Sequence, residues 1–171
     1  MADIFLLLLL TSCQTIMATK DWELNLSAKI NGPTVDQVWP YLADYCNLYK
    51  IYPTDVTFCD KGTKVQPGLN RYSLTKSPTP SDPNSTVVFW VAEELLKISA
   101  TEKYVTYEIQ ENNRGIDKLI ATMQVLPSGD NGCKFKWTIV ASPFGGLTHK
   151  VFVESFEGFL SSIVSLIENL F

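Results

Sequence analysis

The sequence is poor in residues that bind metals or cofactors. It contains one histidine, His149, and four cysteines, Cys13, Cys46, Cys59 and Cys133, none of which forms a CxxC pair. This spacing argues against a zinc or haem site, and no glycine motif for phosphates or dinucleotides is present. We therefore expect no metal and no cofactor. Because three cysteines, an odd number, lie beyond the N-terminal segment, we expect buried, reduced thiols.

An excess of positive charge is also missing. The formal net charge is −4, which argues against nucleic acid as a partner because nucleic-acid-binding domains are typically basic. The apolar run at Ile4–Leu10 is too short to span a membrane, so we expect no stable membrane insertion. With 46% apolar and 19% charged residues in 171 residues, the chain has the composition and length of a single globular domain.

The N-terminal segment leaves three interpretations open. The run Ile4–Leu10 resembles the apolar region of a signal peptide, but no basic residue precedes it. Residues 1–20 are a signal-like leader or an unstructured extension, or the start at Met1 is not used and translation begins at Met17. We expect the domain to cover residues 21–171. We expect a cytoplasmic location, with the secretory pathway (ER, vacuole or extracellular space) as the alternative if a leader at 1–16 is functional.

The middle of the chain has the pattern of an antiparallel sheet. Residues Trp22–Ile30 alternate between apolar and polar, which is typical of a half-buried strand. A helix from Thr34 through Leu42 and a short helical turn at Tyr45–Tyr49 follow. Three prolines predict a loop at Lys76–Asn84. The remaining predicted strands are Val56–Cys59, Leu69–Leu74, Thr86–Ser99, Tyr104–Glu111, Ile116–Leu126 and Cys133–Ala141.

A long amphipathic helix is predicted from Thr148 to the C-terminus. Its apolar residues recur with a period of 3.6 at Phe152, Phe156, Phe159, Ile163, Leu166, Ile167 and Leu170. A helix of about 22 residues is about 33 Å long and lies across a whole domain. Its apolar stripe needs a concave partner, which a curved antiparallel sheet supplies. We therefore predict an α+β domain that encloses a small apolar ligand between sheet and helix.

Two charged residues interrupt the apolar rows of the predicted strands. Glu93 shares a strand face with Phe89 and Val91, and Arg71 shares one with Leu69, by the period-two rule. A buried charge is costly unless it is paired. Periodicity alone favours a structural ion pair in the core, or a bulge that turns both side chains outward. The functional alternative is that both line a cavity, where Arg71 holds an oxygen-bearing group and Glu93 moves a proton.

Tyr107 is the polar-tipped residue of an otherwise apolar row in the next strand. Its hydroxyl requires a partner, which is either solvent, the backbone or a ligand. His149, at the start of the last helix, has no serine–acid or cysteine constellation around it and is interpreted as a surface or cap residue.

Six short motifs occur in a specific order and spacing. They are Val38-Trp39-Pro40, Cys46-Asn47-Leu48-Tyr49-Lys50, Pro67-Gly68-Leu69-Asn70-Arg71-Tyr72, Phe89-Trp90-Val91-Ala92-Glu93-Glu94-Leu95, Ala121-Thr122-Met123-Gln124 and Phe135-Lys136-Trp137. In these motifs, from about Trp22 to the C-terminus, the chain resembles the lachrymatory-factor-synthase-like proteins. These form a plant family of the START-like, birch-pollen-allergen-like superfamily, often labelled polyketide cyclase/dehydrase or lipid transport.

The resemblance implies a helix-grip fold, in which a seven-stranded antiparallel sheet curves around a long C-terminal helix and leaves an internal hydrophobic cavity. It implies that Arg71 and Glu93 are the catalytic pair and that Tyr107 matches a pocket tyrosine. A second pocket tyrosine of the synthase is replaced here by Leu119, so the substrate differs. We expect Tyr107, Phe89, Leu119, Trp137 and Phe156 to bind the substrate.

The leading hypothesis is a cofactor-independent isomerase or cyclase that acts on a small hydrophobic plant metabolite by proton transfer. The alternative is non-catalytic binding or transport of hydrophobic small molecules or lipids. The gate and latch motifs of the related hormone receptors are replaced by Thr75-Lys76-Ser77-Pro78 and Arg114-Gly115-Ile116, which argues against a receptor. The proline-rich loop at Pro78–Pro83 is expected near the pocket entrance. We expect a monomer or a weak dimer.

Overall fold

The computed structural model describes residues 20–60, 64–79, 82–129 and 132–171. Within them, seven strands form one antiparallel sheet in the order β1-β7-β6-β5-β4-β3-β2. The strands are β1 (Trp22–Asn31), β2 (Val56–Cys59), β3 (Asn70–Thr79), β4 (Asp82–Ser99), β5 (Tyr104–Asn112), β6 (Leu119–Pro127) and β7 (Gly132–Ala141). The helices are α1 (Val35–Ala43), the 3₁₀-helix η1 (Tyr45–Lys50) and α2 (His149–Glu168). The proposed leader, with Cys13 and Met17, lies outside the described residues.

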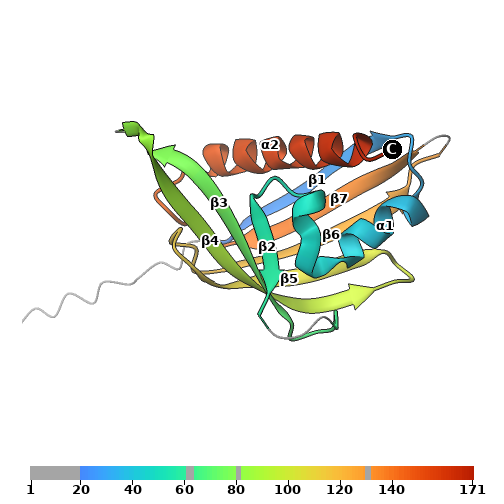
Figure 1. Cartoon of the computed structure of the whole chain (residues 1–171), viewed down its shortest axis with the longest axis horizontal. Helices are drawn as coiled ribbons and strands as arrows, with labels where there is room; N and C mark the ends of the chain where they lie inside the picture. Colours follow the sequence, from blue (N-terminus) through green and yellow to red (C-terminus); the bar gives the residue numbers. More distant parts are fainter. Residues whose placement is uncertain (1–19, 61–63, 80–81, 130–131) are drawn as a thin grey trace, which may run out of the picture.

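The sheet is strongly curved, and α2 lies along its concave face (Figure 1). The helices α1 and η1 lie beside the C-terminal half of α2, and the β3–β4 hairpin extends past its N-terminal end. This is the predicted α+β arrangement of a seven-stranded antiparallel sheet curved around a C-terminal helix.

At both ends of α2 a side chain accepts a hydrogen bond from a backbone N–H group. Thr148 caps its N-terminus by accepting a hydrogen bond from the backbone N–H of Val151 at 3.3 Å. At the other end, Glu168 accepts hydrogen bonds from the backbone and side chain of Asn31 at 2.8 and 3.0 Å, which fixes α2 to the end of β1. No helix in the described ranges is long and apolar enough to cross a membrane.

The buried stripe of α2 matches the prediction at most positions. Its buried residues are Phe152, Phe156, Leu160, Ile163 and Ile167. Leu160 takes a place in the stripe that the sequence pattern did not assign, whereas Phe159 is half-buried and Leu170 lies beyond the helix with 41% of its surface exposed. Each fully buried side chain of this size stabilises the fold by about 1.5–3 kcal/mol.

The loop predicted at Lys76–Asn84 is wrong, because β3 and β4 continue through most of it as a hairpin. Pro78 is tolerated because this part of the hairpin has free edges. Pairing of β2 with β3 begins only at Leu74, and pairing of β4 with β5 begins only at Val91. A proline that lacks an N–H therefore costs little at Pro78, where the register of the hairpin also shifts.

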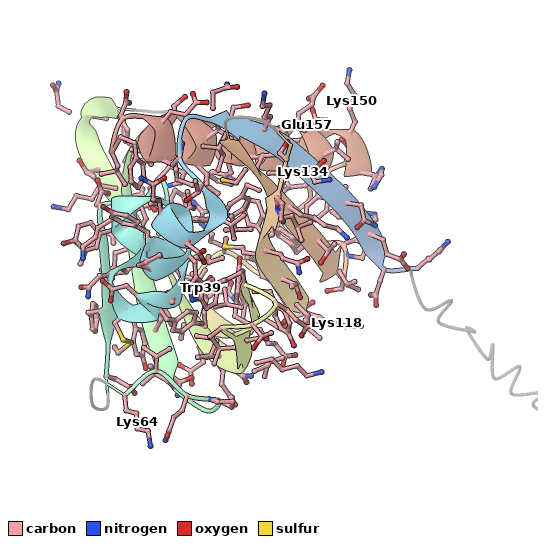
Figure 2. The ribbon with its side chains drawn as sticks, turned by 90° about the vertical axis from the view of Figure 1, so that its right-hand side faces the viewer. Trp39, Lys64, Lys118, Lys134, Lys150 and Glu157 are labelled. Carbon is pink, nitrogen blue, oxygen red and sulfur yellow. A yellow bond between two sulfur atoms is a disulfide. The ribbon has the colours of Figure 1, made fainter. Side chains whose placement is uncertain are left out.

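The expectation of reduced cysteines is wrong for two of them. Cys46 in η1 and Cys59 in β2 form a disulfide, visible as a yellow bond in Figure 2. Cys133 is a buried free thiol, as expected. The odd number of cysteines was misleading because two of the three are bonded to each other and the third is a free thiol in the core. The disulfide fastens η1 to the edge strand β2, which also binds η1 through the Thr57 hydroxyl and the Cys46 carbonyl at 2.9 Å.

We expect the Cys46→Ser/Cys59→Ser variant to unfold with a free energy about 3 kcal/mol lower than that of the oxidised wild type. The bond joins residues 13 apart in sequence, and closing a loop of about 15 residues contributes about 3 kcal/mol by restricting the unfolded chain. Urea denaturation followed by circular dichroism measures this difference. Wild-type protein treated with a reductant serves as the control and should match the variant. Equal unfolding free energies with and without reductant would contradict the disulfide.

Candidate functional site

A pocket of about 200 Å³ lies between the concave face of the sheet and α2. Its wall is mostly aromatic and aliphatic, with Phe152, Phe156 and Phe159 from α2 facing Phe89 and Leu119 from the sheet. The volume is below the ~300–1,000 Å³ of most ligand pockets, so the ligand that it fits is small. The predicted substrate-binding residues Phe89, Tyr107, Leu119 and Phe156 all lie in this wall.

Arg71 and Glu93 form a buried ion pair at the inner end of the pocket. They are direct cross-strand partners in the β3–β4 ladder, and 1% and 5% of their surfaces are exposed. Arg71 donates hydrogen bonds from Nε and Nη2 to Glu93 Oε2 at 2.9 and 2.7 Å. The hydroxyl of Ser73 donates a third bond to the same oxygen at 2.9 Å. Glu93 Oε2 is therefore fully engaged.

Tyr45, in η1, supports the ion pair from behind. Its ring lies 4.1 Å from the guanidinium carbon of Arg71, and its carbonyl accepts a hydrogen bond from Arg71 Nη1 at 3.3 Å. Its hydroxyl donates to the backbone carbonyl of Glu93 at 3.1 Å. Burial lowers the pKa of Arg71, but the charge and hydrogen bond of Glu93 together with Tyr45 and Tyr107 outweigh it and raise this pKa above its ordinary value. The guanidinium thus stays charged.

A bulge lies next to Glu93 in the β4–β5 ladder. Ala92 pairs with Glu111 but Glu93 pairs with Ile109, so β5 contributes one extra residue at this point. Bulges often occur beside functional sites because they redirect a side chain. Glu93 nevertheless faces inward. The alternative considered from the sequence, in which a bulge turns the side chains of Arg71 and Glu93 into solvent, is therefore wrong. Glu93 lines the pocket, and the hydrogen bonds that its carboxylate accepts from described side chains all go to Oε2, not Oε1.

Two predicted site residues do not lie in the pocket wall. Arg71 is not in the wall, and its Nε, Nη1 and Nη2 atoms each donate a hydrogen bond to Glu93 or to the Tyr45 carbonyl. Trp137 is fully buried, and the rings of Tyr52 and Phe156 cover it at centroid distances of 5.9 and 5.1 Å. The expected roles of both residues toward a ligand therefore stay predictions. Each supports a residue that lines the pocket.

Two tyrosine hydroxyls supply polar atoms to the apolar wall. Tyr107, in β5, and Tyr52, after η1, both line the pocket, and neither hydroxyl bonds to another described residue. Burial raises the pKa of Tyr52 and of Tyr107 above the ordinary tyrosine value, so both stay protonated and can donate a hydrogen bond. Tyr52 was missed in the sequence because it stands before Pro53 in an irregular segment without periodicity.

Glu93 and Arg114 are the charged residues of the pocket wall. Arg114 lies between the strands predicted at Tyr104–Glu111 and Ile116–Leu126, but the sequence pattern did not show which way this connection faces. An arginine in a turn between two strands that border a cavity is the signal that could have identified it.

The curved sheet, the C-terminal helix and the pocket between them define a ligand-binding domain of the helix-grip type. Residues 21–168 match the family model described as polyketide cyclase / dehydrase and lipid transport. The chain belongs to this family.

Solved structures share the fold at low sequence identity. The protein XoxI from Bacillus cereus is 18% identical with a TM-score of 0.67, over 87% of this chain and 94% of that chain. Ginseng major latex-like protein 151 from Panax ginseng is 15% identical with a TM-score of 0.67, over 87% and 96%. An uncharacterised protein from Bacillus thuringiensis is 18% identical with a TM-score of 0.68, over 88% and 98%. At these identities the likeness concerns the fold alone.

The ion pair can be tested with a double-mutant cycle of Arg71→Met and Glu93→Gln. We expect Arg71→Met to lower the unfolding free energy by about 3–5 kcal/mol, because it leaves a buried carboxylate without its partner. The double variant should lose less than the sum of the two single losses, by roughly 2 kcal/mol or more. Urea denaturation measures all four proteins.

An exposed ion pair provides the control. Lys118 and Asp21 are 2.6 Å apart, with 45% and 33% of their side-chain surfaces exposed, and Lys118 is labelled at the surface in Figure 2. We expect Lys118→Met to cost at most about 1 kcal/mol. Additive losses at Arg71 and Glu93 would contradict a coupled buried pair.

Proposed function

We propose that this protein binds a small, largely apolar metabolite in the pocket and isomerises or cyclises it by proton transfer, with Glu93 as the base. The observation that carries the proposal is the asymmetry of the Glu93 carboxylate. Oε2 accepts three hydrogen bonds from Arg71 and Ser73, whereas Oε1 belongs to a pocket-lining side chain and accepts none from the described residues. A positioned carboxylate oxygen in an apolar pocket is suited to general-base catalysis.

The pocket residues divide the chemistry between them. Glu93 Oε1 takes a proton from one atom of the substrate and returns it to another, so the reaction needs no cofactor and leaves the protein unchanged. Tyr52 and Tyr107 donate hydrogen bonds to a substrate oxygen, on which negative charge develops when the proton leaves. Arg71 is a positioning residue, since it fixes Glu93 and balances its charge without lining the pocket.

The motif resemblance supports a reaction like that of the lachrymatory-factor synthase. Glu93 stands at the matching position, and Tyr107 matches one pocket tyrosine. Leu119, which is 3% exposed, replaces a second pocket tyrosine and makes this part of the wall apolar. We therefore propose a substrate that differs from the sulfenic acid of the synthase and is apolar where it meets Leu119.

A non-catalytic carrier is the second candidate function. The apolar wall formed by Phe89, Phe152, Phe156 and Phe159 favours it, because such a pocket retains apolar ligands without any chemistry. The family description includes lipid transport as well as cyclases. A carrier binds ligand but exchanges none of its protons with water, and this difference separates the two functions.

The disulfide supports the secretory alternative for the compartment. Structural disulfides persist in oxidising compartments and are rare in the cytosol, and Cys46–Cys59 joins two segments that support the ion pair. Mass spectrometry of the protein from its native tissue would read the mature N-terminus and the state of both cysteines. Reduced cysteines in that sample would favour the cytoplasm.

Proton abstraction can be measured without knowing the natural substrate. The probe is 4-phenylbutan-2-one in D₂O, a small apolar ketone, and NMR follows deuterium incorporation next to its carbonyl. We expect Glu93→Gln to slow enzyme-dependent exchange by about 10²–10⁴-fold, the usual contribution of a general base. Binding, followed through the fluorescence of the pocket residue Trp90, should stay within about tenfold of wild type.

Glu94→Gln is the matched control. Glu94 is the next residue of β4 and does not line the pocket, so its substitution should leave the exchange rate unchanged. Binding without exchange in the wild type would establish the carrier. Exchange that persists in Glu93→Gln would remove Glu93 from the mechanism, and failure of the ketone to bind at all would contradict the ligand pocket.

A further inference from the structure

The outer end of the pocket is built around a second guanidinium. Arg114 lies in the turn between β5 and β6, and its guanidinium carbon is 4.6 Å from the centroid of the Phe89 ring. Both residues line the pocket. Because Arg114 and the neighbouring wall residues Leu147 and Ser155 are exposed at the surface whereas Glu93 is buried, Arg114 marks the mouth of the pocket and Glu93 its inner end.

Two asparagine side chains hold this turn in place. Asn112 Oδ1 accepts hydrogen bonds from the backbone N–H groups of Arg114 and Ile116 at 2.9 and 3.0 Å. Asn113 is tied to β4 through the N–H of Trp90 and the carbonyl of Val88, both at 2.9 Å. These bonds explain why β6 begins later than the sequence predicts. They also pre-position the backbone of Arg114, which lowers the entropic cost of binding a ligand there.

The charge of Arg114 has no counterpart nearby. None of the salt bridges between described residues involves Arg114. The charges of Arg71 and Glu93 cancel each other at the inner end. The net charge of the site is therefore the single positive charge of Arg114 at its mouth. A guanidinium presents a planar fork of N–H donors that matches a carboxylate.

We propose that the ligand is a small amphipathic carboxylic acid whose carboxylate binds Arg114 while its apolar body extends toward Glu93 and the two pocket tyrosines. This inference rests on the proposed ligand-binding function and specifies its substrate class. Phe89 and Glu93 are four residues apart on β4, or about 13 Å along a strand, which separates the anion from the reacting part of the ligand. A single guanidinium with no second cation in the wall fits a monoanion better than a phosphate dianion.

The test compares two probes of equal length, 4-phenylbutanoate and the neutral 4-phenylbutan-1-ol. We expect wild-type protein to bind the acid at least about tenfold more tightly, as for a hydrogen bond to a charged group. In Arg114→Gln this preference should fall to within about twofold, and Arg114→Lys should retain part of it. Titration calorimetry measures both affinities, and added salt should weaken acid binding in the wild type because the mouth is exposed.

Lys150→Gln is the matched control for loss of one positive charge. Lys150 is on α2, has 82% of its side chain exposed and does not line the pocket, and it points away from the molecule in Figure 2. We expect this variant to keep the full preference for the acid. Equal binding of acid and alcohol by the wild type, or an unchanged preference in Arg114→Gln, would overturn the inference and leave the binding function intact. Failure of both probes to bind would overturn the proposed function as well.

Discussion

The buried pairing of Arg71 with Glu93 is the constraint on which the rest of the site depends. Two unpaired charges in this position would be prohibitively costly, so the surrounding structure satisfies nearly every polar atom of the pair. The β3–β4 register places the two side chains opposite each other, and Tyr45 supplies a carbonyl, a hydroxyl and an aromatic face. The disulfide at Cys46, the residue after Tyr45, fastens this support to the sheet.

The same pairing makes the pocket asymmetric. Since Oε2 of Glu93 is occupied by Arg71 and Ser73, only Oε1 is left for a ligand. The tyrosine hydroxyls of Tyr52 and Tyr107 are the nearby neutral donors of the wall. At this end of the pocket, one free carboxylate oxygen, neutral hydroxyl donors and an apolar wall are the groups that the proposed proton transfer uses.

The sequence allowed the sheet, the long C-terminal helix and the inward faces of Arg71 and Glu93 to be predicted, because all three follow from local periodicity. It did not allow three non-local features to be predicted. The Cys46–Cys59 bond depends on how η1 packs on an edge strand. Pro78 is tolerated in β3 because β2 begins opposite Leu74 and does not extend to Pro78. Which member of the charged pair lines the pocket depends on Tyr45, a residue that no strand pattern links to the site.

The position of Arg71 behind Glu93 alters the chemistry that the pair can perform. An arginine in the pocket would bind the oxygen of the substrate directly and stabilise a full negative charge on it. In the proposed reaction that oxygen meets neutral hydroxyls, those of Tyr52 and Tyr107, whose pKa values burial raises. Neutral donors stabilise a partial charge less strongly than a cation does. The proposed reaction is therefore restricted to substrates whose protons are already acidic. Because only one oxygen of Glu93 is free, the proton leaves and returns on the same face of the ligand.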